Sequence, residues 1–489
     1  MYGTFFTLSA WSVAAPIGAQ GDADHHISSI WCGWGESEGI CEDYGDHGFG
    51  YTARVPYINQ MCNGRTLDYW PNCEPEKPAE NTQVLRTSAP ETKSFYYVVM
   101  RAFVGSDVTQ SIVIMRLFNS LLASIFFFFV IWTSTGRTRL AALSAWTFTL
   151  VPVAVRTISN LNPLSWSYVG VMSSWVFLHS ALNTTSDKRQ KKIGLFALYT
   201  LAMGLAAATR WDAVIFGLFS SLVLIVGYFI QKSLLTIRQL LKLGGVVVAM
   251  VIAVRAISPF VRYVSQVRLP QSYPAHQFFL FQLTRIPENL SQIWEYDVGQ
   301  DGGGPGIIGI LGLSLFAICL AFSLQRTTKT QIILSGSVLI FIFISMMKIS
   351  IVWDFLMPVW GYYLVGPVCF LLGVSVLYSQ NKRQFMSSIG NRYSAIGMLS
   401  LTRLLSLYAY MEFYVRRGQN IGVFANLSLN GGWWWENGPG PNYVLAFGAL
   451  SFPTFLILAW KTVPMSGPFP ATEDLLADSD LEIDDSITK

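Results

Sequence analysis

The segment Tyr2–Gly18 (YGTFFTLSAWSVAAPIG) and the stretch Gly21-Asp22-Ala23-Asp24-His25-His26 just after it organise the rest of the chain. The first is almost wholly apolar or small, and the second places two carboxylates and two imidazoles within five positions. If Tyr2–Gly18 enters a bilayer, these groups lie where the chain leaves the lipid. Ionisable groups are costly to desolvate there, so their concentration indicates a functional site. The alternative is that they are simply hydrated among the lipid headgroups.

The composition predicts an all-α polytopic membrane protein. The 489 residues are 52% hydrophobic and 13% charged, whereas soluble domains carry about 25% charged residues. The charges are segregated, with basic residues in short loops and acidic residues in Glu473–Asp485. The formal charge of +4 therefore indicates no nucleic-acid partner, and the expected surroundings are a lipid bilayer. No basic region precedes Tyr2–Gly18, so we expect no cleavable signal peptide.

Hydropathy predicts a bundle of about 12 transmembrane helices. The expected ranges are 3–18, 108–133, 139–157, 163–182, 193–209, 211–230, 242–262, 305–324, 331–349, 358–379, 393–413 and 442–461. Every second loop between them is rich in lysine and arginine, which is typical of the cytoplasmic side. We therefore expect a multi-pass protein of the cell (plasma) membrane with both termini cytoplasmic.

This topology predicts one transmembrane domain over residues 1–461 and an acidic, disordered cytoplasmic tail over 462–489. The long loops 19–107, 263–304 and 414–441 all fall on the extracytoplasmic side. In the first of them, Ile27–Trp34 and Ser94–Val104 are expected to be short helices lying on the membrane. The intervening stretch is expected to be irregular.

Four of the six cysteines, Cys32, Cys41, Cys62 and Cys73, fall in that first loop. Two disulfides with three possible connectivities would staple it, as suits an oxidising compartment. A four-cysteine zinc site is the alternative, although the loop has no CxxC pair.

Arginines that approach the same predicted face from several helices indicate a site for an anionic group, because guanidinium binds phosphate in a fixed forked geometry. Arg210-Trp211-Asp212 joins two apolar segments with almost no loop, so it is expected in a tight turn. Arg210 is either a phosphate ligand or half of an ion pair with Asp212 that ties two helix ends together. Arg156, just before Asn160, is a second candidate ligand.

The aromatic run Trp433-Trp434-Trp435 in the last outer loop has two interpretations. Aromatic residues form belts at the membrane interface. Alternatively, Trp433 and Trp434 stack against a sugar ring or a prenyl chain.

Several stretches resemble, in the same order along the chain, the domain of unknown function 2142 family of bacterial membrane proteins in its actinobacterial form. They are Pro16-Ile17-Gly18-Ala19, Asp22-Ala23-Asp24-His25-His26, Phe95-Tyr96-Tyr97, Met115-Arg116-Leu117-x-Asn119, Ser159-Asn160-x-Asn162-Pro163-x-Ser165-Trp166, Arg210-x-Asp212 and Trp433-Trp434-Trp435.

That family in turn resembles glycosyltransferases of the GT-C fold. The resemblance implies transfer of a sugar from a polyprenyl-phosphate-linked donor to a glycan, lipid or protein acceptor of the cell envelope, with inversion. It implies that Asp22, or Asp24 next to it, acts as general base, with His26 orienting it or relaying the proton. Arginines would hold the lipid phosphate. No cofactor is required, although a divalent metal could be bound by the carboxylates and imidazoles.

The chain departs from the family pattern, since Ala23 replaces one carboxylate and Trp360-Gly361-Tyr362-Tyr363 stands where a late arginine is expected. Two other functions therefore stay open. A polyprenyl-linked lipid or glycan flippase would have polar residues and broken helices at mid-membrane. A non-catalytic membrane scaffold would tolerate replacement of Asp22.

Overall fold

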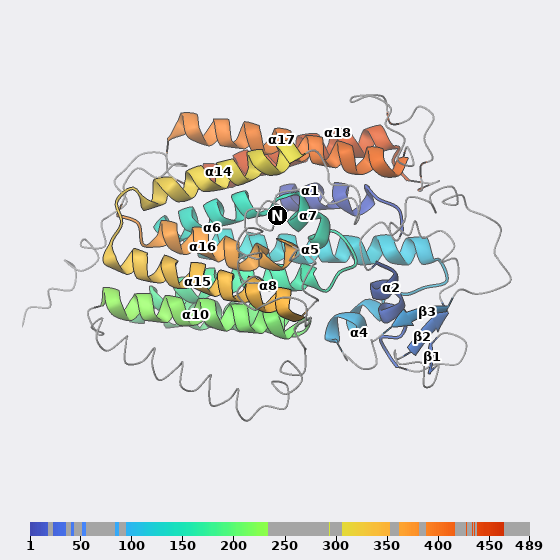
Figure 1. Cartoon of the computed structure of the whole chain (residues 1–489), viewed down its shortest axis with the longest axis horizontal. Coiled ribbons are helices and arrows are strands. Elements are labelled where there is room, and N and C mark those ends of the chain that lie inside the picture. Colours follow the sequence, from blue (N-terminus) through green and yellow to red (C-terminus); the bar gives the residue numbers. More distant parts are fainter. Residues whose placement is uncertain are drawn as a thin grey trace, which may run out of the picture.

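The structure is a computed structural model that describes residues 1–17, 23–35, 41–43, 51–54, 84–87, 94–232, 293, 306–352, 361–380, 388–415, 427, 433, 435 and 438–463. A long helical bundle carries a small lobe at one end, shown on the right of Figure 1. We call this end of the bundle the lobe end and the opposite one the basic end.

The helices of the bundle run lengthwise beside one another, except for the short α7 (Pro152–Ile158), which is bent by 92° from α6 (Figure 1). They are α1 (Tyr2–Val13), α5 (Val108–Thr133), α6 (Gly136–Thr149), α7 (Pro152–Ile158), α8 (Leu164–Leu182), α9 (Arg189–Ala207), α10 (Trp211–Gln231), α14 (Gly306–Leu324), α15 (Lys329–Val352), α16 (Val365–Leu377), α17 (Ile389–Val415) and α18 (Pro441–Lys461). Short 3₁₀ turns precede two of them, η3 (Ser186–Lys188) before α9 and η4 (Gly361–Leu364) before α16.

The prediction of a helical membrane protein is confirmed. A helix overlaps each expected span among the described residues, whereas the span expected at 242–262 lies outside them. By length and apolarity, four described helices can cross a membrane, namely those at Val108–Thr133, Asp212–Gln231, Lys329–Met346 and Pro441–Lys461. The number rises to five if α6 and α7 form one bent span, so the count of about twelve stays a prediction.

The span expected at 139–157 consists of two helices. α6 ends at Thr149, and α7 begins at Pro152 after a bend of 92°. Proline has no amide hydrogen and its ring clashes with the preceding turn, so a helix cannot continue straight through it. The first helix is also shorter than expected, because α1 ends at Val13, three residues before Pro16.

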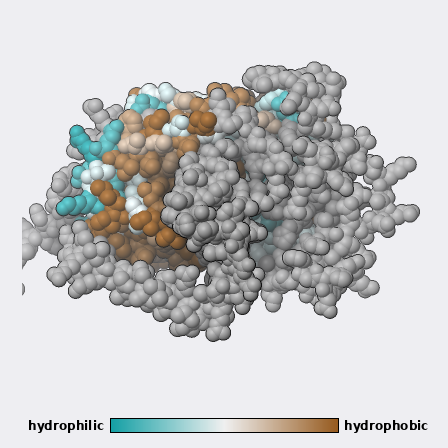
Figure 2. Space-filling view, viewed as in Figure 1, coloured by the Kyte–Doolittle hydropathy of each residue, from teal (hydrophilic) through white to brown (hydrophobic). Residues whose placement is uncertain are grey.

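The surface of the bundle is that of a protein in lipid. In the described part of the face in Figure 2, apolar side chains form a continuous area, and hydrophilic ones gather toward the basic end. Leu450 on α18, Trp132 on α5 and Ile340 on α15 are each exposed by more than half. A bilayer can cover such side chains, whereas soluble monomers rarely expose large contiguous apolar patches.

The core is centred on α8, which packs closely against α9 through Gly170. A Cβ on Gly170 would lie 2.5 Å from the carbonyl oxygen of Ala202 and 3.1 Å from the Cβ of Ala206. Small residues let two helix backbones approach, and such contacts drive helix association in membranes. The large side chains Trp146, Trp175 and Phe370 fill the space between α6, α8 and α16.

The lobe contains two short helices, α2 (Ala23–Trp31) and α4 (Phe95–Arg101), near the two predicted positions. α2 begins four residues before the predicted start at Ile27 and therefore includes Asp24 and His26. It also contains an antiparallel sheet of β1 (Cys41–Asp43), β2 (Tyr51–Arg54) and β3 (Val84–Thr87) in the order β1-β2-β3, where an irregular loop was expected. The Cys32–Cys41 disulfide ties the end of α2 to β1. Cys62 and Cys73 lie outside the described residues.

At the basic end, arginine side chains donate hydrogen bonds to backbone carbonyls at the ends of helices. Arg392 donates to the carbonyl of Trp460 at 3.0 Å, and Arg139 donates to those of Ser134 and Thr462 at 2.8 and 3.0 Å. Arg137 donates to the carbonyl of Ser379 beyond α16. The last carbonyls of a helix have no partner within it and carry partial negative charge, so a guanidinium there stabilises the helix.

We predict that Gly170→Ala destabilises the protein, because the added methyl group has no room between α8 and α9. Overpacking of this kind costs about 1–3 kcal/mol. Gly194→Ala on α9 is the matched control, since a Cβ there meets no atom within 4 Å. Thermal unfolding of the purified protein should show a lower midpoint for Gly170→Ala only. Equal midpoints for the two variants would contradict the close approach.

Candidate functional site

The C-terminus of α1 is held by a buried arginine from the neighbouring helix. Arg116 on α5 is 2% exposed and donates to the carbonyls of Ser12 at 3.1 Å, Ala15 at 2.8 Å and Pro16 at 2.9 Å. A hydroxyl pair, Ser12 with Ser120 at 2.8 Å, joins the same two helices. The end of α1, just before the Asp22–His26 stretch, is therefore fixed to α5.

A second hydrogen-bond donor to the end of α1 comes from a residue near the other end of the chain. The indole nitrogen of Trp435 donates to the carbonyl of Val13 at 2.6 Å. Trp435 is buried among the residues that join the lobe to the bundle, which include Ile17, Ile30 and Tyr96. The third tryptophan of the aromatic run is thus a structural anchor.

Next to this helix end lies a buried polar network built on Asn119 of α5. Its side-chain nitrogen donates to the hydroxyl of Tyr96 at 3.2 Å and to the carbonyl of Asn160 at 2.8 Å. Its side-chain oxygen accepts from the indole of Trp166 at 2.9 Å. A buried asparagine with these partners meets most of its hydrogen-bonding capacity, so it fixes α4, α5, α8 and the loop after α7 in one arrangement.

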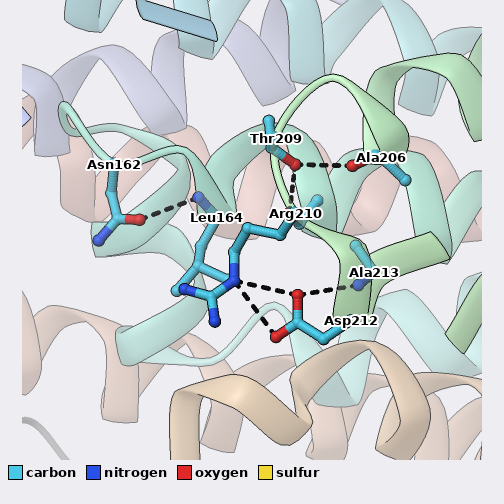
Figure 3. A network of polar contacts seen from close by, with 8 residues as sticks. Asn162, Leu164, Ala206, Thr209, Arg210, Asp212 and Ala213 are labelled. Carbon is cyan, nitrogen blue, oxygen red and sulfur yellow. Dashed lines mark hydrogen bonds and ion pairs between the residues drawn. The ribbon is translucent and has the colours of Figure 1, made fainter. Parts of the chain in front are cut away.

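Arg210 and Asp212 form an ion pair at the turn between α9 and α10 (Figure 3). The Nε of Arg210 donates to the two carboxylate oxygens of Asp212 at 3.0 and 3.2 Å, and one of these oxygens also accepts from the backbone of Ala213 at 2.9 Å. The two side chains are 36% and 34% exposed. The guanidinium of Arg210 also lies 4.9 Å from the ring centre of Tyr363.

The ion pair keeps Arg210 charged. Burial disfavours the charge, but the carboxylate of Asp212 and the hydroxyl of Tyr363 outweigh it and raise the pKa of Arg210 above its ordinary value. Asp212 takes the Nε edge, so the pair is a local contact at the start of α10, where Arg210 is the N-cap. It leaves the terminal nitrogens of the fork free of that carboxylate. An ion pair with Asp212 and a role as phosphate ligand are therefore both compatible with the geometry of Arg210.

Arg156 approaches the same region from α7. It is 8% exposed, and α7 packs against α8, which carries Tyr168, and against α17, which carries Tyr410. Arg210 acts on Tyr168. Tyr410 in turn interacts with Asn160 and lies within the field of Arg116. Cationic side chains from α5, α7 and the α9–α10 turn thus gather around two buried tyrosines at the lobe end.

The lobe rests on this region. The backbone amide of Tyr96 donates to the carbonyl of Ala208 at 3.3 Å, and the hydroxyl of Ser94 donates to the same carbonyl at 3.2 Å. These bonds seat α4 on the turn that holds Arg210. The stretches singled out in the sequence, which lie far apart along the chain, therefore meet at one end of the bundle.

A family model described as a predicted membrane protein (DUF2142) matches residues 5–286, which is more than half of the chain. The chain belongs to the DUF2142 family. No curated protein and no solved structure matches it. The DUF2142 match covers α1 to α10 and hence the Arg116 cap, the Asn119 network and the Arg210–Asp212 pair.

The structure describes only some of the other predicted site residues. Asp22 and Trp434 lie outside the described residues, and Asp24 belongs to α2 without a described side chain. The Nδ1 of His26 lies 3.0 Å from the hydroxyl of Tyr97 on α4, so this imidazole faces the second helix of the lobe. Trp433 is half-buried against the core. Within the described ranges, no three His, Cys, Asp or Glu side chains gather closely enough to hold a metal ion.

Sequence reasoning did not single out Asn119, Tyr168, Tyr410 or Trp435 as site residues. Tyr168 and Tyr410 lie in apolar helices, where a tyrosine carries no signal of its own. Asn119 did offer a signal, because an asparagine inside an apolar segment needs partners in a membrane.

We predict that Arg116→Met destabilises the protein, because it leaves buried carbonyls at the end of α1 without donors while keeping an unbranched side chain. Each buried group that loses its partner costs about 1–3 kcal/mol. The control is Arg189→Met, at an exposed position at the basic end. Thermal unfolding should give a lower midpoint for Arg116→Met alone. A midpoint like that of the control would show that other groups satisfy the carbonyls.

Proposed function

We propose that this DUF2142 protein is an integral-membrane glycosyltransferase that moves a sugar from a polyprenyl-phosphate donor to a cell-envelope glycan, lipid or protein acceptor. The observation that carries the proposal is the place of Arg210 and the buried Arg156 at the lobe end, where Asp212 holds the Nε edge of Arg210 at 3.0 and 3.2 Å. Guanidinium groups at a membrane boundary suit a lipid phosphate, and nearby carboxylates suit proton abstraction.

In the proposed reaction, the hydroxyl oxygen of the acceptor attacks the anomeric carbon of the sugar. Asp22 takes the proton that this hydroxyl loses. The bond between that carbon and the lipid phosphate breaks on the opposite face, so the configuration inverts. Arg210, with Arg156, stabilises the negative charge that develops on the departing phosphate. Asp212 positions Arg210 by holding its Nε edge.

The proposal includes a topology. The lobe end faces the extracytoplasmic side, where the Cys32–Cys41 disulfide is stable. The basic end, with Arg137, Arg139 and Arg392, faces the cytoplasm of a plasma membrane, and both termini lie on that side. The lobe and the last outer loop then border the acceptor.

A flippase is the second candidate, and two observations favour it. The 92° bend between α6 and α7 breaks a predicted span. Arg403, in the middle of α17, is 4% exposed, and its terminal nitrogens have no hydrogen-bond partner in the described part of the chain. Its guanidinium lies 4.7 Å from the ring centre of Phe452. Protein that binds prenyl phosphates but transfers no sugar from any donor would support this candidate.

We predict that Asp22→Asn abolishes sugar transfer, since an amide cannot accept the proton at neutral pH. The assay uses purified protein, a panel of radiolabelled polyprenyl-phosphate sugars and cell-envelope acceptor. The control is Asp187→Asn, an exposed carboxylate at the basic end. Sugar transfer that survives Asp22→Asn but is lost in Asp24→Asn would identify Asp24 as the base. Transfer that survives both would refute a base in this stretch.

We predict that Arg210→Gln weakens prenyl-phosphate binding at least tenfold, because a neutral amide cannot replace the charged fork. Asp212→Ala should also weaken binding by releasing Arg210. Asp212→Asn should preserve it, because the amide oxygen still accepts from Nε and the opposing charge is gone. Equilibrium binding of farnesyl phosphate measures all three. Unchanged binding in Arg210→Gln would leave the ion pair with a purely structural role.

A further inference from the structure

The surface of the lobe carries an exposed tryptophan with an arginine stacked on its ring. Trp34, three residues after the end of α2, is 66% exposed, and the guanidinium carbon of Arg101 on α4 lies 5.4 Å from the centre of the ring. The indole nitrogen of Trp34 donates to the carbonyl of Val98 at 3.0 Å. The last four carbonyls of a helix have no partner within it, so this bond caps the end of α4 and fixes the indole ring.

The backbone that carries this pair is closely packed. A Cβ on Gly33 would lie 2.4 Å from the carbonyl oxygen of Tyr97, so the turn after α2 touches the backbone of α4 directly. The Cys32–Cys41 disulfide ties the same turn to β1. The indole and the guanidinium therefore belong to two segments that have little room to shift, and the positive charge is positioned before a ligand arrives.

Arg101 keeps hydrogen-bonding capacity at its edge. Among the side chains that the structure describes, no carboxylate forms an ion pair with it. Stacking on an aromatic ring uses the flat face of the guanidinium, and the N–H donors lie in the plane of the group and point outward. A phosphate matches these donors in geometry and charge. Arg101 therefore presents a positioned edge for an anionic group at the protein surface.

Apolar side chains are exposed next to this charge. Phe95 is 57% exposed and Val98 is 38% exposed, and Ala102 is exposed as well. Residues three and four apart lie on the same side of a helix, so these three form one exposed apolar face of α4. Together with the Trp34 ring, this face needs an apolar environment, whereas Arg101 needs an anion. A partner that offers both fits the surface best.

The position of α4 identifies the lipid bilayer as this partner. The backbone amide of Tyr96 donates to the carbonyl of Ala208, four residues before the candidate membrane span that starts at Asp212. Phe95 therefore lies at the end of a span, and Figure 1 shows α4 between the bundle and the sheet of the lobe. Arg101 follows six residues later, about 9 Å along the helix. The headgroup layer adds about 5–8 Å to each side of the hydrocarbon core, so Arg101 lies close to the lipid phosphates at any tilt of α4.

We propose that Arg101, stacked on Trp34, binds the phosphate of an anionic phospholipid at the lobe end of the bundle, while Phe95 and Val98 contact the upper part of its acyl chains. Tryptophan rings favour this level of a bilayer, and an anionic surface attracts a cationic side chain. The site fixes the lobe against the membrane surface. It is independent of the proposed sugar transfer, and neither proposal fails with the other.

The experiment uses the full-length protein in nanodiscs of phosphatidylcholine with a small fraction of phosphatidylglycerol that carries a photoreactive diazirine on its headgroup. Mass spectrometry of the cross-linked peptides should place the label on Trp34 or on residues 95–102. Excess unlabelled phosphatidylglycerol in the discs should prevent this labelling, whereas inorganic phosphate in the buffer should not. Inorganic phosphate that prevents the labelling equally well would replace the lipid by a free anion, and absence of label from the lobe would overturn the site.

A pair of variants tests the role of the charge. Arg101→Gln should reduce the labelling of the lobe at least fivefold, because a neutral amide does not replace the charged fork. Lys191→Gln removes the same charge at an exposed position of the basic end and should leave the labelling of the lobe unchanged. Equal labelling of the lobe in both variants would overturn the proposal. Thermal unfolding checks that both are folded, and the competition experiment on the unaltered protein decides the question if Arg101→Gln is not.

Discussion

The cap of Arg116 on the end of α1 is the interaction on which the rest of the lobe end depends. The carbonyls of Ser12, Ala15 and Pro16 point out of a helix that stops inside a bundle, where water is scarce. An unpaired carbonyl in such a place costs about as much as a lost hydrogen bond, and a charged donor that serves three of them removes that cost. The cap therefore sets where the chain leaves α1.

Arginine caps also occur at the basic end, where Arg392, Arg139 and Arg137 donate to carbonyls at helix ends. These arginines also belong to the basic loops that indicated the topology. A single residue type thus serves two purposes, since it biases orientation during insertion and satisfies the backbone after folding. The buried Arg116 needs no transport role to explain its place inside a span. Arg403 has no such partners among the described residues and stays the strongest feature in favour of lipid movement.

The arginines at the lobe end are the basis of the glycosyltransferase proposal. Arg210 is charged and is positioned by Asp212. Arg156 and Arg116 reach the neighbouring tyrosines from other helices. The Asn119 network and the seating of α4 on Ala208 then hold the lobe against these groups.

The sequence by itself determined the helical membrane class, nearly all helix positions within the described residues, and the two short lobe helices, because apolar runs long enough to span lipid leave few alternatives. It also singled out Arg156, Asn160, Arg210 and Asp212 as candidate site residues, because charged and amide side chains are conspicuous beside apolar segments. Only the tertiary structure decided the bend at Pro152, the sheet of the lobe, the pairing of Cys32 with Cys41 and the partners of Arg116, Asn119 and Trp435. Most of these features join residues that are far apart in the sequence, so local sequence patterns do not predict them. At Pro152 the apolar run favours one span and the proline favours a break, and the packing of the folded chain decided for the break.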